Sequence, residues 1–98
     1  MENVLNKKVI VRGDRSGVFF GTITKKEGRE VTLENCRRLW YWEGAASISQ
    51  LASEGTKASS SCKFTVTVDE VVILDAIEIN YCTDKAIESI EGVAEWKM

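Results

Sequence analysis

The 98-residue sequence contains no histidine and no proline. Histidine is the usual general base and the commonest metal ligand, so its absence excludes Ser-His-Asp and Cys-His sites. Carboxylates remain available as acids and bases, yet nothing in the spacing of Asp14, Glu34 and Asp69 marks a catalytic group. We therefore expect a protein that is not an enzyme and that holds no metal and no cofactor.

Cysteine is scarce, and long apolar runs are absent. Cys36, Cys62 and Cys82 are odd in number and widely spaced, which predicts neither a disulfide framework nor a CxxC metal site but reduced, small apolar residues. No apolar run reaches the length of a membrane span, and the N-terminus lacks the pattern of a signal peptide. The expected location is the cytoplasm.

Length and composition predict one globular domain, residues 1–98, with 44% hydrophobic and 29% charged residues. The net charge of −2 hides an uneven distribution. Residues 1–42 carry nine basic and five acidic side chains, a balance of +4, whereas residues 43–98 carry four and ten, a balance of −6. An anionic partner is therefore expected at the first half, and the acidic second half argues against broad coating of nucleic acid.

The pattern of apolar residues predicts three strands joined by short loops, at 7–13, 18–26 and 31–42, with a bend at Gly21. Beyond them we expect a short helix within 43–55, a strand at 63–68, a longer strand or strand pair at 69–82, and a helix that starts at Thr83 and stops at Gly92. The predicted fold class is α+β: a small bent antiparallel β-barrel of the SH3 or Sm type, with one short inserted helix and a C-terminal helix.

The segment "RRLWYW" at 37–42 concentrates arginines and aromatic rings. In one continuous strand Val31 and Leu33 define the inward side, and alternation then places Arg37 inward with Leu39 and Tyr41. The other face carries Arg38, Trp40 and Trp42. Such a ridge stacks a nucleobase and pairs a phosphate, whereas the alternative is a core or a subunit interface. A single β-bulge near Asn35 would exchange the two faces.

Four further residues complete the candidate ligand-binding set. Ser47 and Ser49 lie at the start of the expected short helix, at and just after "GAAS", where the backbone N–H groups can donate to a bound anion. Arg12 and Arg15 flank the loop "GDRSG" and so border a possible shared anion site. The alternative interpretation of "GAAS", that its small residues let the helix pack closely, remains open beside anion binding.

The pattern "RRLWYWxGAASxSQLAxEG" resembles a family of small uncharacterised proteins of bacteriophages and prophages. The resemblance implies a compact accessory protein made in the host cytoplasm during infection. We therefore expect an anti-defence binding protein, a "sponge", that sequesters a nucleotide-derived signalling molecule without turnover. Nanomolar capture needs about −12 kcal/mol, so we expect a homo-oligomer with the site at a subunit boundary.

Two alternatives stay open. One is a protein-interaction module that inhibits a host protein or serves as a small structural component, with Trp40 and Trp42 as anchors. The other is a single-stranded nucleic-acid binder, which the basic first half favours and the acidic second half opposes.

Overall fold

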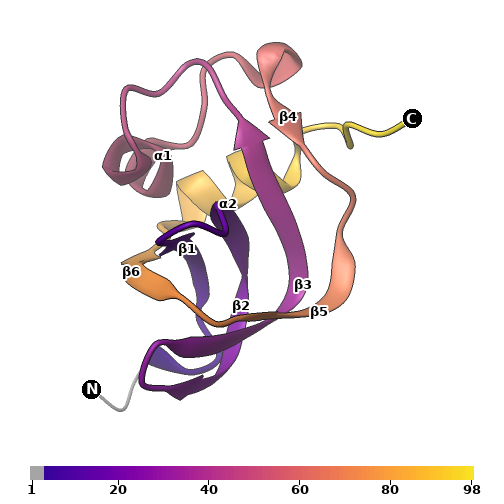
Figure 1. Ribbon diagram of the computed structural model, residues 1–98. Helices are drawn as coiled ribbons and strands as arrows, with labels where there is room; N and C mark the ends of the chain where they lie inside the picture. The colour runs from indigo at the N-terminus through magenta and orange to yellow at the C-terminus, as the bar shows by residue number, and fades with distance from the viewer. Residues whose placement is uncertain (1–3) are drawn as a thin grey trace.

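A computed structural model describes residues 4–98, so residues 1–3 of the predicted domain lie outside the described part (Figure 1). Within residues 4–98 the fold is α+β, as predicted, with six strands and two α-helices. In chain order the elements are β1 (Lys8–Gly13), β2 (Val18–Glu27), β3 (Glu30–Tyr41), α1 (Ile48–Glu54), η2 (Ser59–Ser61), β4 (Lys63–Phe64), β5 (Val68–Ile73), β6 (Ala76–Tyr81) and α2 (Asp84–Glu91).

The strands form one antiparallel sheet in the order β4-β3-β2-β1-β6, and β5 also pairs with β3. The predicted meander of β1, β2 and β3 is confirmed. In Figure 1, β6 lies next to β1, on the side away from β2, and β5 lies next to β3. Within residues 4–98 no backbone pairing joins β5 to β6, so the sheet is bent but not closed, and a barrel is not shown.

Each face of the sheet has its own hydrophobic cluster. The strand-side core is built from strand residues such as Val9, Val11 and Leu33. The helix-side core joins strand residues such as Ile10 and Phe20 to the helices and the segment after α2. Because both faces of the meander are covered, the strands contain runs of consecutive buried residues where a one-sided sheet would alternate.

Both predicted helices are present: α2 begins and ends as predicted, whereas α1 begins at Ile48, after the "GAAS" at which the start was expected. Ser47 caps α1 by accepting the backbone N–H of Gln50, and Thr83 caps α2 by accepting that of Ala86. Glycines at 55 and 92 follow their last residues. No helix between residues 4 and 98 is long and apolar enough to cross a membrane.

The predicted strand at 63–68 is interrupted, which corrects the sequence-based assignment. Only Lys63 and Phe64 form β4, and β5 starts at Val68. Thr65 is held by β3 instead: its N–H donates to the Arg38 carbonyl and its hydroxyl accepts the Arg38 N–H at 2.9 Å. The segment from 69 to 82 is the predicted strand pair, β5 and β6, broken at Leu74 and Asp75.

Candidate ligand-binding site

A β-bulge at Asn35 decides how the arginine and aromatic residues of β3 are oriented. Thr22 pairs with Glu34 and Phe20 with Arg37, so β3 holds one more residue than β2 across this interval, and Asn35 has a positive φ of 50°. Arg38 consequently continues the strand-side face of Leu33, whereas Arg37 turns to the helix side. The expectation that Arg37 shares a face with Val31 and Leu33 is wrong for this reason.

Arg37 is buried, with 5% of its surface exposed, and four of its five guanidinium N–H groups donate to backbone carbonyls of the protein. Nε donates to the Thr65 carbonyl at 3.0 Å, and Nη2 donates to that of Phe64 at 3.1 Å. Nη1 donates to Ile90 at 3.0 Å and Val93 at 2.9 Å, at the C-terminal end of α2, where a cation is favourable. Burial lowers the pKa of Arg37, and the charge of Glu95 opposes that shift. Arg37 thus joins β3, β4 and α2.

Arg38 lies in a partly open cleft. Its guanidinium carbon lies 4.4 Å from the centre of the Phe19 ring, and Nη1 donates to the Ser16 carbonyl. Among residues 4–98 no group accepts a hydrogen bond from its Nε or Nη2, which form the edge that binds a carboxylate or phosphate in bidentate fashion. We call the surrounding hollow of about 230 Å³ the Arg38 cleft, and its lining residues are Phe19, Cys36, Arg38, Thr65, Val66, Val68 and Val71.

The loop at 14–17, which holds Arg38 through Ser16, is itself held by Asp75. One carboxylate oxygen accepts the backbone N–H of Arg15 at 2.8 Å and that of Ser16 at 3.2 Å, and the other accepts the Ser16 hydroxyl at 2.6 Å. These hydrogen bonds, led by the one from the Ser16 hydroxyl, lower the pKa of Asp75. Asp75 therefore fixes the loop that positions Arg38.

Beside the Arg38 cleft the protein exposes two stacked tryptophans. Trp40 and Trp96 have ring centres 6.2 Å apart and planes inclined by 9°, and 62% and 46% of their surfaces are exposed. The Lys63 amine lies 5.6 Å from the Trp96 ring, within cation–π range. We call Trp40, Trp96 and Lys63 the aromatic platform.

The C-terminal segment carries Trp96 to this position. Glu95 bridges to Phe64 in parallel, and the Trp96 N–H donates to the Phe64 carbonyl at 2.8 Å, so the chain end runs beside β4, as Figure 1 shows. A second hollow of about 230 Å³ follows there, lined by Thr65, Trp96, Lys97 and Met98. Because Thr65 lines both hollows, the aromatic platform and the Arg38 cleft belong to one continuous surface.

Trp42 does not belong to that surface, which corrects the predicted ridge of three residues. It follows the end of β3, is half-buried and packs against the helix-side core. Arg38 and Trp40 are two positions apart on β3, about 7 Å between Cα atoms at 3.3–3.4 Å per residue. Both lie outside the helix-side core that holds Leu39 between them, although β3 shifts its register against β4 between Leu39 and Tyr41. The ridge therefore consists of these two residues, and Trp96 supplies the second ring.

The remaining candidate residues lie elsewhere. Ser47 is the N-cap of α1, and the Ser49 carbonyl accepts the Ser53 hydroxyl, so both act within the helix. Arg12 is exposed on β1 and lies 3.7 Å from Glu78. Arg15 is exposed in the loop that holds Arg38 through the Ser16 carbonyl, but it is not among the residues that line the Arg38 cleft.

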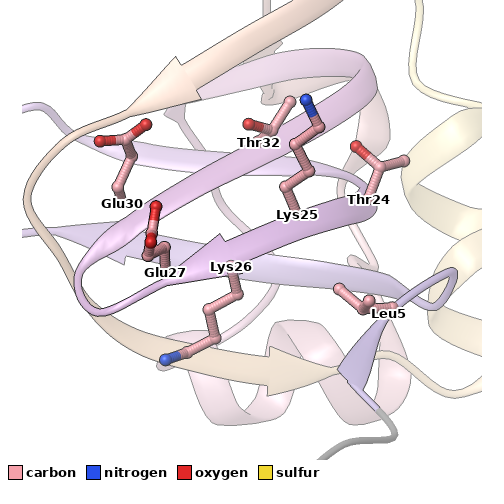
Figure 2. Close-up of a pocket in the computed structure, with 7 residues that line it drawn as sticks. All are labelled: Leu5, Thr24, Lys25, Lys26, Glu27, Glu30 and Thr32. Atoms are coloured by element: carbon pink, nitrogen blue, oxygen red, sulfur yellow. The ribbon is translucent and has the colours of Figure 1, made fainter.

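The β2–β3 hairpin carries another hollow, of about 390 Å³ (Figure 2). Its charged lining residues are Lys25, Lys26, Glu27 and Glu30, so the charges balance. Figure 2 shows the amines of Lys25 and Lys26 pointing to opposite sides of the hairpin. They do not converge on one anion, and this hollow is not a candidate site.

The cysteines offer no reactive group at the surface. Cys36, Cys62 and Cys82 are free thiols, and burial raises the pKa of Cys36 and of Cys82 to about 12. Such thiols are protonated at neutral pH and do not act as nucleophiles. Within residues 4–98 no group of three or more Cys, Asp or Glu side chains is arranged to hold a metal ion.

Sequence reasoning missed Trp96, Lys63 and Asp75. Trp96 could have been considered as the third tryptophan of the chain, but no periodicity in the sequence connects it to Trp40. Lys63 and Asp75 have no local signal, because their roles depend on strand pairing and on a contact across 59 positions, from Ser16 to Asp75.

Fold and site together define a small α+β domain with an exposed aromatic platform beside an arginine cleft. The chain belongs to the family described as a domain of unknown function, DUF6948, which matches residues 6–90. No match to the chain is found among curated proteins.

Proposed function

We propose that the protein binds a nucleotide-like anion without turnover, with the base on the aromatic platform and a phosphate in the Arg38 cleft. The observation that carries this proposal is the pairing of exposed, parallel indoles with an arginine whose bidentate edge is free. The Cα atoms of Arg38 and Trp40 are about 7 Å apart along β3, so one small ligand can contact both side chains.

The fixed position of the Arg38 guanidinium supports an anion as the ligand. Stacking on Phe19 and the bond to the Ser16 carbonyl fix the guanidinium before any ligand arrives, so little side-chain entropy is lost on binding. Lys63 adds a second cation at the aromatic platform. Base stacking contributes about 1–3 kcal/mol per base, and a hydrogen bond to a charged group about 1.5–3 kcal/mol.

These contributions set the affinity of a single site. After the cost of association, we expect a dissociation constant of about 10 µM to 1 mM for a mononucleotide. Sequestering a signal present at nanomolar concentration requires a larger ligand that contacts more of the surface, such as a cyclic dinucleotide or an ADP-ribose derivative. The proposed role is that of a phage accessory protein that withdraws such a signal in the host cytoplasm.

The test is isothermal titration of the full chain with cyclic dinucleotides and ADP-ribose-derived nucleotides, supported by native mass spectrometry for stoichiometry. Arg38→Ala and Trp40→Ala should each weaken binding by about 10- to 150-fold. Trp42→Phe, which alters the half-buried ring outside the site, is the matched control and should leave binding unchanged. No binding by the wild type, or equal losses in all three variants, contradicts the proposal.

A second candidate function is recognition of a protein, with the aromatic platform as the anchor. The hollow beside it favours this candidate, because Trp96 and Met98 present apolar surface there. The two functions separate at Arg38: its replacement by alanine weakens nucleotide binding by about 10- to 150-fold under the first and leaves protein binding largely intact under the second. Trp40→Ala weakens both.

A further inference from the structure

The Arg38 cleft offers an anion one pair of donors and walls that are otherwise apolar. Within residues 4–98 Arg38 is the one lining residue that carries a charge, and Nε and Nη2 form its free edge. The Thr65 hydroxyl is already used: it accepts the Arg38 N–H at 2.9 Å and donates to the Val66 carbonyl at 3.2 Å. The Cys36 thiol is buried and uncharged. The other lining residues are Phe19, Val66, Val68 and Val71.

The other cations of this surface lie outside the Arg38 cleft. The Lys63 amine lies 5.6 Å from the Trp96 ring, so it belongs to the aromatic platform. Lys97 lies 3.5 Å from Glu95. Neither lysine lines the Arg38 cleft, and Arg15 does not line it either. A ligand group held in the cleft is therefore balanced by a single positive charge.

The β5 wall of the Arg38 cleft brings negative charge to its border. Asp69 and Glu70 follow Val68 along the strand and precede Val71, so two exposed carboxylates lie between two lining residues. These carboxylates repel a further negative charge in the cleft, although water weakens the repulsion. The cleft thus accommodates one negative charge of a ligand and opposes a second.

We infer that the Arg38 cleft selects a phosphate diester and disfavours a terminal phosphate, an inference that rests on the proposed function. A diester carries one negative charge on two oxygens, which match the two donors of the guanidinium edge. Its other two oxygens bear carbon, and they can face the apolar walls at little cost. A terminal phosphate carries about 1.5–2 negative charges at pH 7, and it turns a third charged oxygen toward walls that hold no free donor.

This preference gives the proposed protein a means to distinguish signals from ordinary nucleotides. Every phosphate of a cyclic dinucleotide or of ADP-ribose is internal and carries one charge, whereas AMP, ADP and ATP end in a terminal phosphate. The aromatic platform stacks the base of either kind of ligand. Discrimination therefore arises in the Arg38 cleft, through the charge that it leaves unpaired.

The test compares adenosine 5′-monophosphate with its methyl ester by NMR titration of the full chain. The two ligands differ by one methyl group. The monophosphate has a second pKa of about 6, so about 3% of it is singly charged at pH 7.5 and about 90% at pH 5. The ester should bind about 5- to 30-fold more tightly at pH 7.5, where the singly charged fraction sets the upper figure. Between pH 7.5 and pH 5 the affinity for the monophosphate should rise by a similar factor relative to that for the ester.

Titration of the protein does not produce this difference. Any change in the charge of the cleft acts on both ligands, so the ester reports it. The acidic residues on the elements that border the cleft are Asp14, Glu34, Asp69 and Glu70. Cys36, with a pKa of about 12, stays protonated, and Asp75, with a pKa below 3.8, stays ionised at both pH values. Arg15 and Arg38 stay cationic.

Two lysine variants on β5 form a matched pair. Val68 lines the Arg38 cleft and Val72 does not, and 41% and 47% of their surfaces are exposed. Val68→Lys adds a second cation at the cleft and should remove most of the preference for the ester at pH 7.5, whereas Val72→Lys should retain the wild-type preference. Because each result is a ratio of two ligands on one protein, a partial folding defect does not alter it.

Three results would overturn the inference and leave the proposed function in place: equal binding of the two ligands at pH 7.5, no relative gain of the monophosphate at pH 5, or the same loss of preference in both lysine variants. If neither ligand shifts any signal of the protein, the proposed function fails and this inference fails with it. The two failures are therefore distinguishable.

Discussion

Replacing Arg37 by methionine should destabilise the protein far more than the same change at Arg38. Methionine retains most of the length of the side chain and removes every donor. Two carbonyls, Thr65 and Val93, then lose the donor that the fold supplies to them, whereas Ile90 and Phe64 keep the backbone N–H groups of Val93 and Trp96. Only the carbonyls of Thr65 and Val93 should therefore add substantially to the loss of stability.

Each unsatisfied carbonyl costs about 1–3 kcal/mol when water does not reach it. The Val93 carbonyl is buried, whereas that of Thr65 is only partly buried and contributes about 1 kcal/mol, so we expect a loss of about 2–4 kcal/mol in the free energy of unfolding. A domain of this size has roughly 5–15 kcal/mol in total. The same loss lowers the melting temperature by roughly 10–30 °C.

Urea unfolding followed by circular dichroism measures this difference. Arg38→Met removes one hydrogen bond and the stacking on Phe19 at a partly open site, and it should lose about 1 kcal/mol or less. Arg37→Lys keeps a charge and some of the donors, so its loss should lie between the two. An Arg37→Met variant as stable as Arg38→Met would refute the role assigned to Arg37.

Two further predictions concern the loop at Asp75 and the glycines. The pKa of Asp75 lies below its ordinary 3.8 in the folded state, so the stability that its carboxylate contributes is present above pH 3.8 and is lost as pH falls through the folded pKa. The free energy of unfolding, measured with urea from pH 7 to pH 3, should therefore fall less steeply in Asp75→Asn than in the wild type. Parallel curves for the two proteins would contradict this role of Asp75. Gly55 and Gly28 both have positive φ, of 77° and 60°, but an added Cβ meets the Ser89 side chain at 2.3 Å only at Gly55. Gly28→Ala should lower the free energy of unfolding by about 1–2 kcal/mol, and Gly55→Ala should lower it clearly more. Equal melting temperatures for the two variants would show that the Ser89 side chain moves aside at no cost.

Local signals predict most of the fold. The meander of β1 to β3 follows from short apolar runs joined by polar turns, and the two helices follow from the cap at Thr83 and from the glycines at 55 and 92. The interruption after Phe64 was not predictable, because it arises from the pairing of Thr65 with Arg38, 27 positions earlier.

The candidate site was predicted in part. Arg38 and Trp40 both lie outside the helix-side core, as the sequence predicts, but the bulge at Asn35 decides which core Arg38 adjoins, and nothing in the residues around Asn35 fixes a bulge. Arg37 and Arg38 look equivalent in the sequence, whereas the bulge at Asn35 and the carbonyls after α2 leave Arg37 buried and Arg38 in a partly open cleft. Trp96 joins Trp40 through the chain end, a contact between distant residues that no local pattern encodes.

The central claim is that a nucleotide lies on the aromatic platform, and the indole N–H signals test it most directly. The chain has three tryptophans, so a ¹H–¹⁵N correlation spectrum should give three indole signals, assignable by single Trp→Phe variants. On titration with a cyclic dinucleotide or an ADP-ribose derivative, we predict that the signals of Trp40 and Trp96 move and saturate together while that of Trp42 stays in place. Three unmoved signals, or a shift confined to Trp42, would contradict the account.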